Sequence, residues 1–312
     1  MSPGARFQFW REAFALRGSI TPHVLPQVSV FGLIAFAIAW GSAQIESRTG
    51  IKIGLEVAPL EIAGAALGLL LILRTNSGYD RWWEARKLWG GIVNQSRNLA
   101  ISGVAYGPRD RQWHSQFVKW AAVFPHIARN SLRGEPPAAD VERLLGAEES
   151  RRIAQSGHMP SYVALRFAGM LKEARESLQL DGFSYLQIDK ERASLIDHIG
   201  ACERILKTPL PLVYSIKIRR FIMLFLLTLP FALLHRMQGD WLIPLVTILV
   251  GYPLISLDQI GVELQSPFSK ANLGHLPLDE ISANIERNVT GLLKVELPPR
   301  LPELEAVSLA VR

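Results

Sequence analysis

The feature that most limits the possible folds is a run of 22 residues, from Val24 to Ile45, that holds no charged side chain. A helix of about 20 apolar residues spans the hydrocarbon core of a bilayer. The segment before this run is basic and aromatic, with Arg6, Trp10, Arg11 and Arg17. Because basic residues favour the cytoplasmic side of a membrane, the run is predicted to be the first span, with the N-terminus in the cytoplasm.

A second apolar segment, residues 57–73, leads without a linker into RTNSGYDRWWEARKLW, residues 74–89. Apolar and charged residues come here in blocks, whereas a soluble amphipathic helix interleaves them at a period near 3.6. Tryptophan and tyrosine favour the membrane–water interface, and arginine its cytoplasmic side. This order predicts a second span whose helix leaves the bilayer into the cytoplasm. A buried soluble helix with a charged cap is the alternative.

Residues 74–220 contain no further long apolar run and have the pattern of several amphipathic helices separated by loops with Pro and Gly. This segment has 23 Lys and Arg against 15 Asp and Glu, an excess of +8, while the whole chain has a net charge of +6. Such an excess agrees with a cytoplasmic location. No nucleic-acid-binding motif accompanies it, so no nucleic-acid partner is predicted. We expect a helical cytoplasmic domain.

Two shorter apolar segments, residues 221–234 and 241–257, predict spans three and four. The basic residues Lys217, Arg219 and Arg220 precede the first of them and place this end in the cytoplasm. The predicted organisation is 1–73 for the N-terminal segment and spans one and two, 74–220 for the cytoplasmic domain, 221–257 for spans three and four, and 258–312 for a cytoplasmic C-terminal arm.

The sequence holds no recognisable catalytic constellation, so an enzyme is not predicted and no catalytic residue, cofactor or metal site is assigned. Neither G-x-x-x-x-G-K-[ST] nor H-E-x-x-H occurs, and the seven His residues include no i, i+4 pair. His198 and Cys202 are four residues apart and so share a helical face. A buried thiol beside a surface His is a more common arrangement than a catalytic pair. One Cys in the chain excludes an intrachain disulfide.

Three separate segments resemble those of prokaryotic bestrophins. The first is RTNSGYDRWWEAR, residues 74–86. The second is CERI at 202–205, with TPLPLVY at 208–214. The third is ELQSPF at 263–268, with LPLD at 276–279. The resemblance covers about residues 20–295 in the same order, and the chain is identified as similar to the bestrophin family.

The resemblance implies an all-α membrane protein, with four transmembrane helices and a helical cytoplasmic domain per subunit. It further implies a homopentamer around one central pore that passes monovalent ions across the bacterial inner membrane. The partners would be the other subunits, the lipid bilayer and the ions.

The family also has two constrictions along this pore. The neck is lined by span two, and its register from the Arg-Trp-Trp motif assigns it here to Ala65, Leu69 and Leu73. The lower constriction falls near Leu186, with Ile188 as the alternative. A dry apolar neck can gate by losing its water.

Two segments differ from the family pattern. Ala-Leu-Leu is less bulky than the usual neck, which often includes an aromatic residue. Animal members bind calcium through an acidic run after their Pro-Phe, whereas this chain has SKANLGHLP, with no carboxylate before Asp279. Because calcium needs several oxygen ligands, usually including carboxylates, no calcium site is expected.

Glu61 lies within span two, where a carboxylate is costly and marks an ion pathway or a paired group. It is one i+4 step outward from Ala65, so five copies would form a ring at the outer entrance of the pore. Pairing with Lys52 and contact with a neighbouring subunit are the alternatives. Since carboxylate rings favour cations, we predict a channel for monovalent cations such as sodium. A chloride or other anion channel and a non-conducting membrane interaction protein are the alternative functions.

Overall fold

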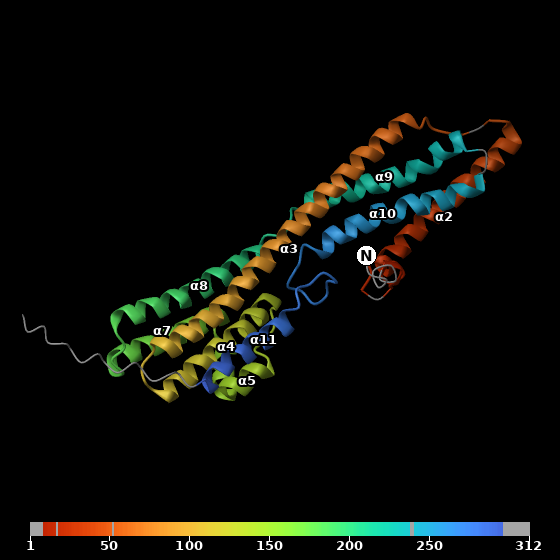
Figure 1. Ribbon diagram of the computed structural model, residues 1–312. Helices are drawn as coiled ribbons and strands as arrows, with labels where there is room; N and C mark the ends of the chain where they lie inside the picture. Colours follow the sequence, from red (N-terminus) through yellow and green to blue (C-terminus); the bar gives the residue numbers. More distant parts are fainter. Residues whose placement is uncertain (1–8, 17, 52, 238–239, 296–312) are drawn as a thin grey trace, which may run out of the picture. The chain divides into compact units, whose positions relative to one another are not determined.

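The computed structural model describes residues 9–16, 18–51, 53–237 and 240–295 (Figure 1). The described residues are largely helical and contain no β-strand. The helices are α2 (Thr21–Thr49), α3 (Ala58–Tyr106), α4 (Arg111–Arg133), α5 (Ala139–Leu145), α6 (Ala147–Gln155), α7 (Met159–Ser177), α8 (Gly182–Lys207), α9 (Leu212–Arg236), α10 (Ile243–Glu263) and α11 (Leu278–Gly291). The all-α fold predicted from the amphipathic and apolar patterns is confirmed.

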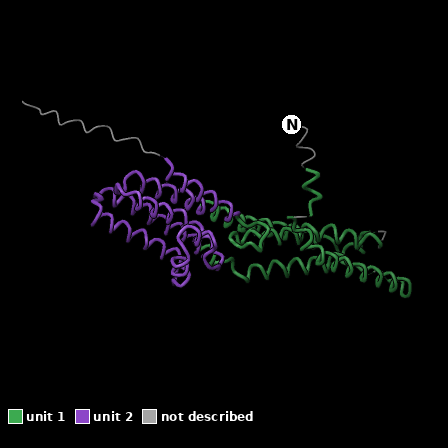
Figure 2. The backbone as a smooth tube through the Cα atoms, turned by 90° about the horizontal axis from the view of Figure 1, so that it is seen from below, with its two compact units in different colours: residues 1–87, 204–276 green, residues 88–203, 277–312 purple. Residues whose placement is uncertain are grey.

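The chain divides into two compact units, coloured separately in Figure 2. Unit 1 comprises residues 1–87 and 204–276, and unit 2 comprises residues 88–203 and 277–312. One boundary falls inside α3 and another near the end of α8. Composition alone places one boundary of the cytoplasmic domain at residues 73/74, whereas α3 continues to Tyr106 and the compact unit changes at residues 87/88. The other predicted boundary, at residues 220/221, falls inside α9, while the compact unit changes in α8 at residues 203/204.

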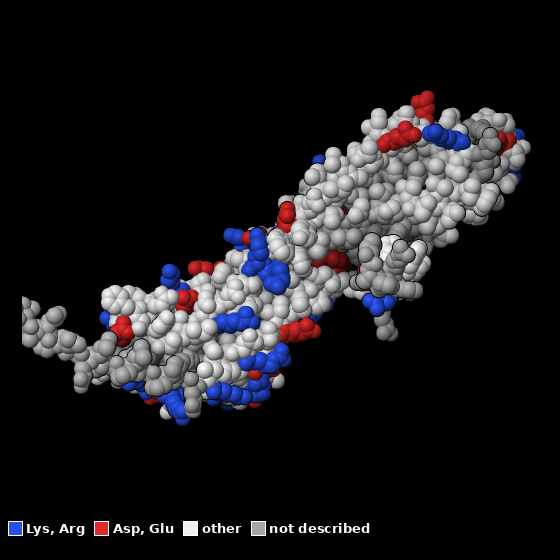
Figure 3. All heavy atoms as spheres, in the orientation of Figure 1, with Lys and Arg blue, Asp and Glu red and all other residues white. Residues whose placement is uncertain are grey.

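Unit 1 holds the apolar helices. Of the helices that the structure describes, three are long and apolar enough to cross a membrane, namely α2, α3 and α10. Helix α9 carries the shorter apolar run at residues 221–234. On the face drawn in Figure 3, the flanks of these helices show uncharged side chains, and charged atoms gather where α2 leads into α3.

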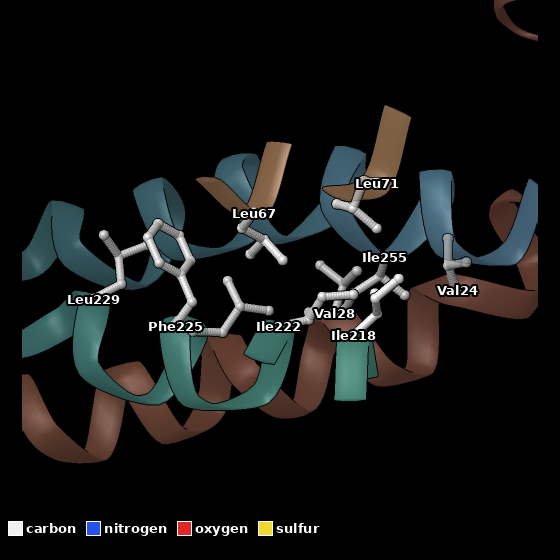
Figure 4. Packing of buried hydrophobic residues seen from close by; sticks show 10 residues of the cluster. Val24, Val28, Leu67, Leu71, Ile218, Ile222, Phe225, Leu229 and Ile255 are labelled. Atoms are coloured by element: carbon white, nitrogen blue, oxygen red, sulfur yellow. The ribbon is translucent and has the colours of Figure 1, made fainter. Parts of the chain in front are cut away.

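The core of unit 1 joins four helices through aliphatic and aromatic side chains. Val24 and Val28 of α2 meet Leu67 and Leu71 of α3, together with residues of α9 and α10, and the side chains point toward one another (Figure 4). Gly32 of α2 lies against α10. A Cβ on Gly32 would lie 2.6 Å from Cδ1 of Ile248, so a side chain at this position would require the Ile248 side chain to move.

Unit 2 is a helical bundle built around α4. Nearly every residue from Phe117 to Asn130 is buried, because α5, α7 and α11 all pack against α4. The side chain of Asp110 caps this helix by accepting a hydrogen bond from the Trp113 backbone N–H at 2.7 Å. Trp113 stacks on Phe117 with a ring separation of 4.6 Å, which fixes the first turn of α4 against the core.

Candidate pore-lining site

Helix α3 presents two different faces along its apolar part. Leu67 and Leu71 are fully buried in the core of unit 1, whereas Leu69 is 59% exposed and Leu73 is 50% exposed. Ala65 is also exposed. The three predicted neck residues therefore lie on the face of α3 that the helices of its own subunit leave uncovered.

The exposed face continues beyond the apolar neck residues into polar ones. At about 100° per residue, Ala65 and Leu73 each lie roughly 40° from Leu69 around the helix axis. Asn76 and Asp80 lie roughly 20° from Leu69 by the same measure, and both are exposed. Asp80 makes no ion pair with any residue that the structure describes. Sequence reasoning missed Asp80, although its spacing from Leu69 and Leu73 was sufficient to find it.

Glu61 lies at the other end of the same helix, roughly 80° around the axis from Leu69. Its carboxylate Oε1 is 3.4 Å from Nη1 of Arg236, at the end of α9, and both side chains are exposed. The predicted partner Lys52 lies outside the described residues. A small apolar cavity of about 170 Å³ lies between α3 and α9 beside this ion pair, and Gly64 and Phe225 are among its lining residues.

The two candidates for the lower constriction differ in their surroundings. Both belong to α8 in unit 2. Leu186 is 66% exposed, whereas Ile188 is fully buried in the core of its own subunit. Only an exposed side chain can face a pore, so the burial pattern favours Leu186.

Arg81 of the Arg-Trp-Trp motif joins α3 to the end of α8 by hydrogen bonds within unit 1. The guanidinium of Arg81 donates to the carbonyl oxygens of Ile205 at 2.6 Å and Thr208 at 2.7 Å. These carbonyls belong to the last turn of α8 and to the residue after it, where no helical N–H is available to pair with them. Burial lowers the pKa of Arg81, and the charge of Glu84 opposes that effect.

Two further contacts involve residues in and beside the Arg-Trp-Trp motif. Glu84 forms an ion pair with Arg204 at 2.8 Å. The indole N–H of Trp82 donates to the Gly274 carbonyl at 2.7 Å, which ties the segment after α10 to α3. Cys202 is fully buried, and no cluster of metal-binding side chains occurs among the described residues. Residues of the first two segments of the sequence resemblance therefore contact one another in this subunit.

A buried charge cluster joins α3, α9 and α10. Nη1 of Arg74 lies 2.5 Å from Oδ1 of Asp258, and Nε of Arg219 lies 3.0 Å from Oδ2 of the same carboxylate. Arg74 is fully buried. Sequence analysis did not predict this cluster. The sequence feature that could have indicated this cluster is the position of Arg74, Arg219 and Asp258, each of which lies at the predicted cytoplasmic end of a predicted span.

Comparison with known proteins identifies the family. The sequence model of the family described as "Bacterial/Fungal Bestrophin protein" matches residues 1–291. The chain belongs to the bacterial/fungal bestrophin family. The resemblance found in the three sequence segments is thereby confirmed, and the chain is a membrane protein.

Relatives and solved structures agree with this assignment. A protein of Nostoc sp. named a voltage-dependent anion channel-forming protein is 30% identical over 311 residues, 97% of this chain and 98% of the relative. A protein of Escherichia coli K12 with the same description is 29% identical, covering 94% of this chain and 95% of the relative. The crystal structure of a bacterial bestrophin homologue from Klebsiella pneumoniae matches with a TM-score of 0.79 and 29% identity, over 88% of this chain and all of that one.

Proposed function

We propose that this bestrophin forms a homopentameric ion channel, with one pore lined by the exposed face of α3. The observation that carries the proposal is the exposure of Leu69 and Leu73 on α3, a long helix that then turns polar on the same side. Large apolar side chains in contact with water are costly. A symmetric ring of subunits would gather them around a single axis, as cyclic oligomers do.

The same arrangement assigns the membrane topology. We infer four spans, formed by α2, the first part of α3, α9 and α10, in the bacterial inner membrane. Basic residues precede α2 and the apolar run of α9, which supports a cytoplasmic location for both termini and for unit 2. Leu186 of α8 would form the lower, cytoplasmic constriction of the pore.

The neck would act as the barrier to ions. A ring of Ala65, Leu69 and Leu73 offers no polar group that replaces the hydration shell of an ion. Apolar constrictions of this kind gate by dewetting, because water leaves a narrow apolar pore more readily than a wide one. The pore would conduct when the ring widens.

The charges that flank the neck favour cations. Asp80 follows the neck on the face that contains Leu69 and has no ion-pair partner among the described residues. Glu61 precedes the neck, but Arg236 lies 3.4 Å away and offsets its charge. Five copies of Asp80 would attract cations and repel anions. The preference for monovalent cations such as sodium therefore depends more on Asp80 than on Glu61.

An anion channel of the same architecture is the second candidate. Two observations favour it. Several relatives bear the name of voltage-dependent anion channel-forming proteins, and Arg236 is an exposed cation at the end of α9, close to the outer entrance. In this case Arg236 would face the pore and Glu61 would hold it in place.

Reconstitution into liposomes tests both candidates and the non-conducting alternative. Ion efflux would be measured from liposomes that contain the purified protein, and the reversal potential would be measured across a sodium chloride gradient. We expect a reversal potential near that of sodium. A value near the chloride potential would establish the anion channel, and efflux equal to that of protein-free liposomes would establish a non-conducting protein.

A further inference from the structure

A second cavity in unit 1 is built differently from the pore-lining face. It has a volume of about 330 Å³ and lies between α2, α9 and α10. Its lining is divided between polar and apolar side chains: Gln27, Arg219, Asp258 and Gln259 on one hand, and Phe31, Ile222, Met223 and Ile255 on the other. None of these residues belongs to α3, so the cavity is separate from the proposed pore lining.

The polar part of the cavity carries a net positive charge. Asp258 accepts a hydrogen bond from Arg219 and forms an ion pair with Arg74, so the three side chains together have a charge of +1. Arg74 is enclosed by protein and unavailable to a ligand. Arg219 uses its Nε for Asp258, and its side chain is 57% exposed, which leaves its terminal nitrogens able to donate.

The two parts of the cavity also fall on either side of the expected membrane boundary. Arg219 lies two positions before the start of the apolar run at 221–234, and Asp258 directly follows the run at 241–257. Ile222 and Ile255 lie one turn further into these runs. A cavity with a cationic rim at the cytoplasmic interface and an apolar floor in the hydrocarbon matches the two ends of a phospholipid.

We propose that this cavity binds one anionic phospholipid, with its phosphate on Arg219 and the start of an acyl chain against Phe31, Ile222 and Met223. Arginine binds phosphate well because its planar guanidinium donates two parallel hydrogen bonds. The amide of Gln27 lies on the same rim and supplies a further donor. The exposed apolar side chains Leu33 and Phe36 of α2 and Leu224 of α9 provide a surface for the remainder of the acyl chains.

Lipid binding by the full-length protein tests this proposal. Purified protein in a neutral detergent would be titrated with phosphatidylglycerol, with phosphatidylcholine and with soluble glycerol phosphate. Bound lipid would be counted by native mass spectrometry. We expect phosphatidylglycerol to bind more tightly than phosphatidylcholine. Equal retention of the two lipids would overturn the proposal, and so would saturation by glycerol phosphate alone, which would mean a site for free phosphate.

Two variants locate the binding. Arg219→Gln should weaken phosphatidylglycerol binding by about tenfold, the value of one charge-assisted pair of hydrogen bonds. Arg220→Gln is the matched control, because Arg220 is its exposed neighbour and lies outside the cavity lining. Met223→Trp fills the apolar part of the cavity without changing any charge. This variant should also abolish the preference for phosphatidylglycerol over phosphatidylcholine. Unchanged lipid binding in Met223→Trp would exclude this cavity, even if Arg219→Gln does not fold.

Discussion

Arg74 and Asp258, which are 184 positions apart in the chain, form a buried ion pair with a separation of 2.5 Å between Nη1 and Oδ1. Arg74 is fully buried, so its charge depends on Asp258 for compensation, whereas Asp258 also pairs with Arg219. Gly261 makes this approach possible. A Cβ at Gly261 would lie 3.3 Å from the Arg74 side chain, closer than nearly all side chains pack.

Asp258→Asn should destabilise the subunit strongly, since it leaves the Arg74 guanidinium buried without its carboxylate. Removing one partner of a buried pair costs about 3–5 kcal/mol. Denaturant unfolding in detergent measures the change. The control is Glu84→Gln, which breaks an exposed pair with Arg204 and should cost less than about 1 kcal/mol. Equal losses in the two variants would show that burial of Arg74 does not govern stability.

Leu69→Ala and Leu73→Ala should each increase ion efflux from liposomes, because a smaller apolar ring holds water more readily. The matched controls are Leu67→Ala and Leu71→Ala, whose side chains are buried in the core of unit 1. These controls should lower the free energy of unfolding by about 2–5 kcal/mol without increasing efflux. If the neck variants lose stability and the efflux is unchanged, α3 does not line the pore with this face.

Charge substitutions near the neck should shift the reversal potential in a sodium chloride gradient in predictable directions. Asp80→Asn should shift it toward the chloride potential, because the ring of unpaired carboxylates is lost. Arg236→Gln should shift it toward the sodium potential, since it releases Glu61 from its neighbouring cation. Glu61→Gln should have a smaller effect than Asp80→Asn. A larger shift in Glu61→Gln than in Asp80→Asn would show that the carboxylate at the outer entrance determines the selectivity.

Ala154→Cys should report the side of the membrane on which unit 2 lies. Ala154 is exposed on α6, and the chain's one native Cys, Cys202, is buried. We expect no reaction with a membrane-impermeant maleimide in intact cells and full reaction after permeabilisation. The unsubstituted protein provides the background. Labelling of intact cells would require the opposite orientation.

Acid should destabilise unit 2 through His126. Burial lowers the pKa of this His below its usual 6.5, and Arg129 adds to the effect, while Asp140 and Glu286 oppose it. Nε2 lies 3.0 Å from Glu286, which Arg143 also binds. Because the unfolded chain takes up a proton at a pH where the folded His126 does not, the free energy of unfolding falls as the pH decreases below about 6.5.

The measurement is the thermal midpoint between pH 7.5 and 5.5. His126→Gln should reduce the pH dependence of the thermal midpoint in this range. The control is His235→Gln, at an exposed position in unit 1, which should show the same pH dependence as the unsubstituted protein. A pH dependence that survives in His126→Gln would assign it to other groups.

The sequence predicts the apolar helices well, because a long run with few or no charged residues is typical of a membrane-spanning helix. The run from Val24 to Ile45 lies inside α2, and the second segment opens α3. Residues 221–234 lie inside α9, and residues 241–257 overlap the 3₁₀ turn before α10 and most of α10 itself. The helical character of the middle region follows from its amphipathic periodicity in the same way.

Pairings between distant segments could not be predicted from the same patterns. Periodicity shows which side of a helix is apolar, but it does not show which helix covers that side. Glu61 therefore had Lys52 as a nearby candidate, whereas the described partner is Arg236, which is 175 positions away. Leu186 and Ile188 were indistinguishable as apolar residues two positions apart, and only the packing of α8 separates them.

The exposure of the α3 face also bears on how such a protein can diverge. Leu69 and Leu73 contribute little to the core of their own subunit, since Leu67 and Leu71 form the contacts with the other helices. A substitution on the exposed face can therefore alter that surface while the subunit still folds. Gly32 of α2 and Gly261 of α10 are more constrained, because a Cβ would lie 2.6 Å from the Ile248 side chain or 3.3 Å from the Arg74 side chain. Helix α3 thus combines exposed positions that are open to change with the buried Leu67 and Leu71, which are not, so its exposed face can diverge on an unchanged bundle.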